Sequence, residues 1–397
     1  MRFWQQCVRL QHEGGLVSLS ALTMATLMLP GESGVRRAVP NVQAFSWESA
    51  APELQHAIDS LQLASQAPGI QVAIRQEGRA LWSGITGSTG DGRTPLAREH
   101  LFRIGGITKT FTAAVILQLA DEGTLQLGDT VARWFPHLPN ADRITVRHLL
   151  EHRSGIRELL KGRSFLARAA LFPGHRFSSA DVIEYLCTAR PYSAPGTGFH
   201  YSNSNYVLLG AIAERLADSR ASSLIRSRLL EPLHLEQTVF LPDDAGRVSP
   251  LGMVIGHDRD YMPLPGSYRV NPDDHSWATL AFTSGAMAST ADDLAIWIDA
   301  LMHGAVLPDF DVDAATSVRD ARNPAIPELT GFGLGLERLS IYGEDWFGHL
   351  GGFVGFGGAV LYAPRTDRTI AVLGNMSTFH GVGAVRAIAR VLAYQDS

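Results

Sequence analysis

Lysine is nearly absent from this sequence, and cysteine is scarce. Lysine occurs only at Lys109 and Lys161, although lysine and arginine together number 34 in 397 residues. The two cysteines, Cys7 and Cys187, cannot form a disulfide framework, and no CxxC or mixed Cys/His cluster indicates a metal site. We therefore expect no metal and no cofactor, and we interpret the loop residue Lys161 as solvated.

Basic clusters and long apolar runs are absent as well. A net charge of −5 without a basic patch gives no reason to expect a nucleic-acid partner. The segment from Leu16 to Leu29 is apolar but shorter than the roughly 20 residues that a stable membrane span needs. Arg2 and Arg9 precede it, as in a secretion signal, whereas Glu13 and the lack of an Ala-x-Ala site argue against one. We expect an exported protein, periplasmic or extracellular, with the cytoplasm as the alternative.

The order of the apolar patterns predicts one large domain after an N-terminal leader. Residues 1–50 contain the signal-like segment and a polar linker, and residues 51–397 form a single domain. In it, residues 51–110 and 325–397 supply the sheet, and residues 111–324 are mainly helical. The predicted fold class is α/β, of the α+β type: a mostly antiparallel sheet from N- and C-terminal segments, flanked by helices, with an inserted helical subdomain.

Local periodicity supports this division. Helices are expected over residues 52–65, 292–302 and 382–394, the second of them capped by Ser289-Thr290. A hairpin is expected over residues 69–75 and 79–84, and further strands at 332–336, 355–362 and 368–374.

Lys109 stands one turn into a predicted buried helix that ends at Asp121. Its neighbours along the chain are apolar, among them Ile104, Ile107 and Phe111. A chain that uses arginine almost everywhere else indicates a need for an amine here, because a desolvated amine can lose its proton and a guanidinium cannot. The alternative, equally consistent with the spacing, is a lysine that passes through the core to reach the surface.

Two further patterns carry polar side chains between apolar segments. Tyr201 and Asn203 form a Tyr-x-Asn sequence just before an apolar helix over residues 207–216. His349 lies in a glycine-rich run, residues 348–358, at the edge of a predicted strand. Either pattern alone is weak, since glycine-rich strands usually mark bulges or tight packing.

In this order, the three stretches resemble the serine β-lactamase and penicillin-binding-protein superfamily. The resemblance covers residues 50–395 and is greatest to the class C-like branch, with its DD-carboxypeptidases and esterases. That family has Ser-x-x-Lys at the head of a buried helix, Tyr-x-Asn on a loop, and Lys/His-x-Gly on the opposite strand. Lys109, Tyr201, Asn203, His349 and Gly351 match these positions. The resemblance implies a β-lactamase/transpeptidase-like fold and a small-molecule or peptide acyl substrate, including esters, β-lactams and D-Ala-D-Ala-like peptides.

The departure from the family falls on the nucleophile. Gly106 occupies the position of the serine whose hydroxyl attacks the carbonyl while Lys109 and Tyr201 move its proton. Glycine has no side chain to attack with. Thr108 and Thr110 lie on other faces of the helix, so we expect neither to substitute.

The remaining site residues are assigned by the same resemblance. The backbone N–H groups of Gly106 and Gly352 are the expected oxyanion donors, and glycine at 106 retains its N–H. Asn203, His349, Gly351 and Gly352 are the expected substrate-binding residues.

Three interpretations of Gly106 remain open at this point. The chain is a variant of an active serine hydrolase, or a pseudoenzyme that binds an acyl, peptide or β-lactam ligand without turnover. In the third, a water polarised by Lys109 and Tyr201 replaces the hydroxyl. The sequence therefore predicts a hydrolase-derived site but leaves open whether the chain is an enzyme.

Overall fold

The computed structural model describes residues 47–248, 252–258, 268–309, 311–317, 321 and 323–395. All of them belong to one compact unit. The signal-like segment, residues 16–29, lies outside the described residues. None of the described helices is both long and apolar enough to cross a membrane.

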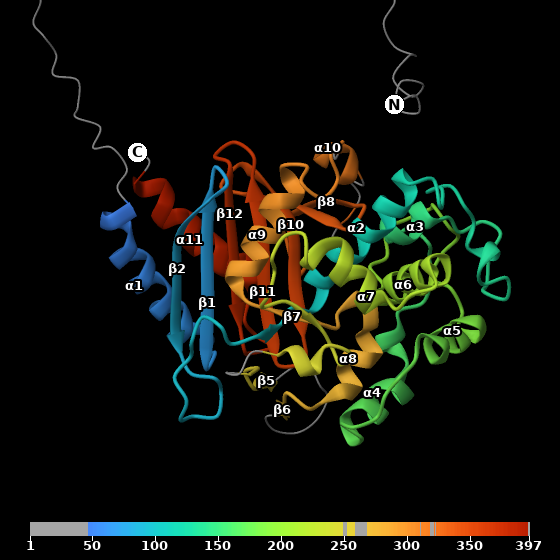
Figure 1. The fold of residues 1–397 in the computed structure, drawn as a ribbon, viewed down its shortest axis with the longest axis horizontal. Coiled ribbons are helices and arrows are strands. Elements are labelled where there is room, and N and C mark those ends of the chain that lie inside the picture. Colours follow the sequence, from blue (N-terminus) through green and yellow to red (C-terminus); the bar gives the residue numbers. More distant parts are fainter. Residues whose placement is uncertain are drawn as a thin grey trace, which may run out of the picture. The chain divides into compact units, whose positions relative to one another are not determined.

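A seven-stranded antiparallel sheet joins the two ends of the described chain (Figure 1). Its order is β2-β1-β12-β11-β10-β9-β8. The first hairpin, β1 (Gly69–Gln76) and β2 (Arg79–Gly87), pairs with the C-terminal strand, and Val72 lies opposite Val372. The other strands are β8 (Leu329–Gly333), β9 (Leu336–Ile341), β10 (Glu344–Phe353), β11 (Phe356–Ala363) and β12 (Arg368–Gly374). The predicted fold class, with its mostly antiparallel sheet from N- and C-terminal segments, is confirmed.

One predicted strand is wrong. Residues 332–336 do not form a single strand, because the chain turns at Leu334 and Gly335 between β8 and β9. Both residues have positive φ, +43° and +89°, and a Cβ built on Gly335 would lie 2.3 Å from the Cβ of Ala113. The turn is therefore pressed against the helix that carries Lys109, which leaves room only for glycine.

Helices cover both faces of the sheet (Figure 1). On one face lie α1 (Trp47–Ser65) and α11 (Gly381–Gln395), which pack against each other and against the strands. On the other face lies α9 (Ala291–Met302), whose N-cap is Thr290 as predicted. Alternate residues of β1 show this division: Val72 packs in the core with α1 and α11, whereas Ala73 packs in the core of the opposite face.

The inserted segment is mainly helical and surrounds α2 (Thr108–Asp121), which packs against α6 (Asn203–Ala217). Its other helices are α3 (Val146–Leu150), α4 (Arg163–Leu171), α5 (Ser179–Thr188), α7 (Ala221–Ile225), α8 (His275–Ala281) and α10 (Val312–Ala315). Small sheets join β3 (Phe102–Arg103) to β7 (Met287–Ser289) and β4 (Val239–Phe240), and β5 (Gly256–Asp258) to β6 (Tyr268–Val270).

Trp297 connects α9 to α2, and its removal should cost much of the stability of the fold. Its fully buried ring stacks on Phe111 at 4.0 Å, and its Nε1–H donates to Thr110 Oγ1 at 2.8 Å. Trp297→Ala should lower the free energy of unfolding by about 3–5 kcal/mol in urea denaturation. Leu63→Ala, at a side chain that is 76% exposed, is the control and should change it by less than about 0.5 kcal/mol. Equal effects of the two substitutions would contradict this account of the core.

Candidate active site

The head of α2 docks on β10 through glycine contacts. Gly105 begins a 3-10 turn, Gly105–Ile107, and has a φ of +48°. A Cβ there would lie 2.3 Å from the carbonyl oxygen of Gly352, and one on Gly351 would lie 2.6 Å from that of Ile104. Because only glycine allows backbones to approach this closely, these contacts fix the position of Gly106 against β10.

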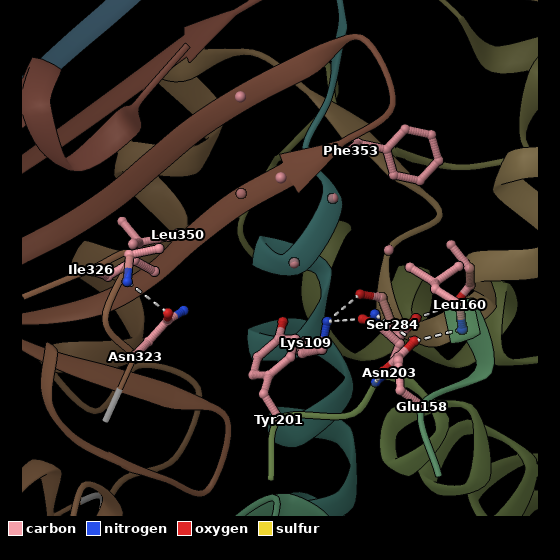
Figure 2. A pocket seen from close by; sticks show the side chains of 18 of the residues that line it. Lys109, Glu158, Leu160, Tyr201, Asn203, Ser284, Asn323, Ile326, Leu350 and Phe353 are labelled. Atoms are coloured by element: carbon pink, nitrogen blue, oxygen red, sulfur yellow. Dashed lines mark hydrogen bonds between the residues drawn. The ribbon is translucent and has the colours of Figure 1, made fainter. Parts of the chain in front are cut away.

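Lys109 lies at the centre of the site and is fully buried. Its Nζ donates to Asn203 Oδ1 and to the carbonyl oxygen of Ser284, both at 2.8 Å (Figure 2). Asn203 is held in turn by Glu158, which accepts from the Asn203 backbone N–H at 2.5 Å and from its side-chain amide at 3.2 Å. The amine therefore does not reach the surface, and the alternative of a lysine that passes through the core is wrong.

The surroundings of Lys109 favour its neutral form. Burial lowers the pKa of the amine from 10.5 to about 7, although the charges of Glu158 and Glu337 oppose the change. Burial likewise raises the pKa of Glu337 from 4.5 to about 7, against the backbone N–H of Leu350 and the charge of Lys109. A desolvated lysine and a desolvated carboxyl group thus both titrate near neutral pH, which is a property of functional sites.

Residue 106 faces the hydroxyl of Tyr201. A Cβ built on Gly106 would lie 3.2 Å from Tyr201 Oη, 2.9 Å from the carbonyl oxygen of Leu350 and 3.0 Å from His349 Cε1. The Tyr201 ring lies 4.9 Å from Lys109 Nζ and 4.3 Å from the buried His152 ring. A side chain at position 106 would therefore lie between the tyrosine hydroxyl and β10, in contact with both.

A cavity of about 720 Å³ opens over these groups. Six of the predicted site residues line it: Gly106, Lys109, Tyr201, Asn203, Gly351 and Gly352. A Cβ on Gly352 would meet nothing within 4 Å, so that glycine faces open space. Apolar side chains form much of the remaining wall, namely Leu160, Phe199, Trp277, Leu280, Ile326, Phe332, Phe353 and Phe379. A ligand of the size of a short peptide or amide fits such a space.

His349 is the one predicted site residue that does not line the cavity. Its side chain is 1% exposed, and its Nδ1 lies 2.6 Å from the carbonyl oxygen of Leu350. Because a carbonyl only accepts, the proton is on Nδ1. Burial and the charge of Lys109 lower the pKa of His349 from 6.5 to about 3, so the ring is neutral at neutral pH. Its predicted contact with a ligand stays a prediction, and its observed place is beside Gly106.

The hydroxyls of Thr108 and Thr110 in α2 point away from the cavity. Thr110 Oγ1 donates to the carbonyl oxygen of Ile107 and accepts from Trp297, and Thr108 Oγ1 accepts from the backbone N–H of Met287. Both side chains are buried, and neither lines the cavity. They do not offer a hydroxyl in the direction of Tyr201.

Sequence reasoning missed three groups that hold the site together. Glu158 orients Asn203, Ser284 supplies a carbonyl oxygen to Lys109, and Glu337 places a carboxyl group on the cavity wall. Glu337 stands in β9 beside the polar residue Arg338 and near Ser340, so nothing in the strand pattern marks it as buried. Glu158 lies in a loop without periodicity, and a backbone carbonyl leaves no trace in a sequence.

The antiparallel sheet, the helix with the buried lysine and the Tyr-x-Asn loop form the framework of an acyl-transfer site. Comparison with known proteins identifies the family. The profile described as Beta-lactamase matches residues 53–395. The chain belongs to this family, and the predicted superfamily of serine β-lactamases and penicillin-binding proteins is confirmed.

Relatives and solved structures agree with the family. Protein flp of Staphylococcus aureus (strain MRSA252) is 25% identical over 327 residues, 78% of this chain and 60% of that protein. The chain thus spans about 60% of the length of this relative. D-amino acid amidase of Ochrobactrum anthropi SV3, complexed with L-phenylalanine amide, is similar in fold, with a TM-score of 0.75 at 23% identity over 88% of this chain and 99% of that one. D-stereospecific amidohydrolase from Streptomyces sp. has a TM-score of 0.70 at 26% identity, over 83% and 95% of the two chains.

The lowered pKa of Lys109 predicts a pH-dependent stability. Between about pH 7 and 10.5 the unfolded chain holds the lysine proton and the folded chain does not, so the free energy of unfolding rises with pH in this window. Lys109→Met removes this contribution. The difference in unfolding free energy between parent and variant should grow with pH by up to about 1.4 kcal/mol per unit, as measured by urea denaturation.

A side effect of the substitution acts in the same direction. Without the Lys109 charge the pKa of Glu337 rises further, and the variant loses stability as that carboxyl group ionises. Lys161→Met, at an exposed lysine, is the matched control and should follow the parent profile. Parallel profiles for the parent and Lys109→Met would show that the buried amine is charged throughout this range.

Proposed function

We propose that this protein binds a small amide, peptide or ester in the cavity above Lys109 and does not form an acyl-enzyme with it. The observation that carries the proposal is Gly106 at the head of α2, in a cavity that keeps Lys109, Tyr201 and Asn203 in contact range. In the parent form of this family a serine at that position performs acyl-enzyme hydrolysis. The chain as it stands is a ligand-binding member with the proton-transfer groups retained.

The contacts around residue 106 support a site adapted to glycine. Gly106 does not have a positive φ, so its backbone would accept another residue. However, a Cβ would lie 2.9 Å from the Leu350 carbonyl oxygen, close enough to require a shift of a few tenths of an ångström in β10 or α2. The neighbours of Gly106 thus lie slightly too close for a serine.

The cavity and the similar proteins support the proposed ligand class. The Streptomyces protein, at 26% identity, is by name a D-stereospecific amidohydrolase. In this chain the glycines at 106 and 352 line the cavity from opposite elements, as a pair of oxyanion donors to an amide carbonyl would. The apolar wall suits an amide with an apolar side chain.

A second candidate function is slow hydrolysis by water. Lys109 and Tyr201 lie on the same side of residue 106, where a bound water could take the place of the serine hydroxyl. Binding and oxyanion contacts alone supply about 10³–10⁴-fold acceleration in the serine-protease template after loss of a triad member. The same export signal that the sequence predicts would bring either activity to extracytoplasmic peptides.

Restoring the serine tests the proposed ancestry of the site. Gly106→Ser should become labelled by a fluorescent penicillin or a fluorophosphonate, because its hydroxyl would lie beside Tyr201 and Lys109. The unmodified protein should not be labelled at Gly106. Gly106→Ala, which adds the Cβ without the hydroxyl, is the control and should stay unlabelled in gel fluorescence and intact-mass measurements. Labelling of Gly106→Ala equal to that of Gly106→Ser would place the reactive hydroxyl elsewhere.

Ligand binding can be measured on the unmodified protein. A D-Ala-D-Ala peptide or an apolar D-amino acid amide should raise the melting temperature, by the equivalent of about 2.7 kcal/mol at 100 times its dissociation constant. Gly352→Leu should abolish the shift, because its side chain would fill the open space above that glycine. No shift with any amide, peptide or β-lactam would contradict the proposed binding role.

A further inference from the structure

We propose that Lys109 is itself a nucleophile, and that it captures a small aldehyde or ketone in the cavity as an imine. The inference rests on the proposed function in one respect, since it uses the same cavity. It assigns to Lys109 a role beyond proton transfer, as the group that forms a bond to the ligand.

The two acceptors around Lys109 determine where its lone pair lies. A neutral amine has two N–H bonds, and Asn203 Oδ1 and the Ser284 carbonyl oxygen accept one each at 2.8 Å. Neither acceptor can donate to the nitrogen. The lone pair therefore points along the remaining tetrahedral direction, away from both of these groups. Among the described residues, Nζ has no further hydrogen-bond partner.

The missing hydroxyl at position 106 leaves that direction without a donor. Residues 106 and 109 are one turn apart and lie on the same side of the helix head. A serine at 106 would offer an O–H to the lysine lone pair and would hold it there. Gly106 cannot do so, and Lys109 lines the cavity together with it. The amine is thus oriented by two hydrogen bonds, and the fully buried Lys109 forms part of the cavity wall that a ligand would contact.

Its protonation state suits a nucleophile. Burial brings the pKa of Lys109 to about 7, so about half of the amine is neutral at neutral pH, against less than one part in a thousand for a solvated lysine. The titratable groups packed around it come from several elements: Glu158, Glu337, His152, His349, Tyr201 and Tyr206.

The reaction balances without any other reagent. The lone pair attacks the carbonyl carbon, and the oxygen takes one proton from nitrogen to give a carbinolamine. The hydroxyl group then leaves as water with the second nitrogen proton, and the nitrogen forms C=N. Tyr201 can relay the protons, since its hydroxyl is the polar group nearest to residue 106 on the loop side. Because the imine gives up both hydrogen bonds of the amine, we expect the adduct to be reversible.

The cavity selects the carbonyl compound by its apolar part. Trp277, Leu280 and Phe353 form part of the wall near α8 and the end of β10, and Phe199 and Phe332 lie on the Tyr201 side. An aromatic or branched aliphatic substituent would be desolvated there. A carbonyl compound with a charged substituent would lose this favourable free energy of apolar burial.

Trapping with a hydride reagent tests the proposal on the whole protein. Benzaldehyde and cyanoborohydride should convert the imine to a stable secondary amine, which is located by peptide mass mapping. Lys109 and Lys161 are the only lysines in the sequence, and the N-terminal amine is the third possible position. Peptide mapping distinguishes these three positions. We expect saturable modification of Lys109 with half its maximal rate near pH 7. Modification confined to Lys161 or the N-terminus, or none, would overturn the proposal.

Four variants test whether Gly106, and not merely the accessibility of a lysine, causes the reactivity. Lys161→Arg should be modified at Lys109 as the parent is, and Lys109→Met should lose the saturable modification. Gly106→Ser should react at least tenfold more slowly than Gly106→Ala, because only the serine hydroxyl can donate a hydrogen bond to the lone pair of the Lys109 nitrogen. Equal rates for these two variants would contradict the role assigned to Gly106.

The outcome is distinguishable from a failure of the proposed function. A melting-temperature rise with amide ligands but no trapped imine would overturn this inference and leave the binding role intact. A trapped imine without any amide binding would contradict the proposed binding role and leave this inference intact.

Discussion

The structure of the site depends on the burial of one amine between two oxygen acceptors. Lys109 is fully buried, and its nitrogen donates to Asn203 and to the Ser284 carbonyl oxygen. A buried polar group is costly unless its hydrogen bonds are satisfied, so these contacts make the position tolerable to the fold. They also join α2, α6 and the residues before β7 into one unit. The same burial lowers the pKa of the amine to about 7, which links the packing of the core to the chemistry of the cavity.

Neighbouring glycines serve two different purposes at the helix head. Gly105 and Gly351 are required by geometry, because their backbones meet β10 and the helix turn at distances that no side chain allows. Gly106 has an ordinary backbone conformation, and its glycine removes a hydroxyl rather than satisfying a torsion angle. Gly105 and Gly351 keep the site assembled, whereas Gly106 changes which reactions the assembled site can perform. Retention of Lys109, Tyr201 and Asn203 around it is why we infer a working cavity.

Much of the fold was predictable from periodicity. The hairpin at 69–84, the helix ending at Asp121 and the capped helix after Thr290 appear where the patterns place them. The turn at Leu334 and Gly335 did not follow from the sequence, because its cause is a contact with Ala113, more than 200 positions away in the chain. Long-range contacts of this kind override a local strand pattern.

The site was predictable to the extent that side-chain motifs define it. Tyr201, Asn203 and Lys109 meet as the motifs predict, because each lies near the start of an element whose position the fold sets. The orientation of the His349 ring did not follow from its motif, since alternation along a strand says which face a side chain takes but not whether a loop covers it. The roles of Glu158 and Glu337 were not predictable from the sequence, because they depend on contacts with Asn203 and Leu350 that only the fold creates.

The central claim, a desolvated Lys109 with a pKa near 7, can be observed directly by NMR. Protein labelled with ¹⁵Nζ-lysine should show two side-chain resonances, since the sequence contains two lysines. We predict that one of them, lost in Lys109→Met, titrates near pH 7, because burial lowers the pKa of the amine. If the Lys109 resonance instead remains that of a charged amine up to pH 10, the amine is not desolvated as described, and the account of the site is contradicted.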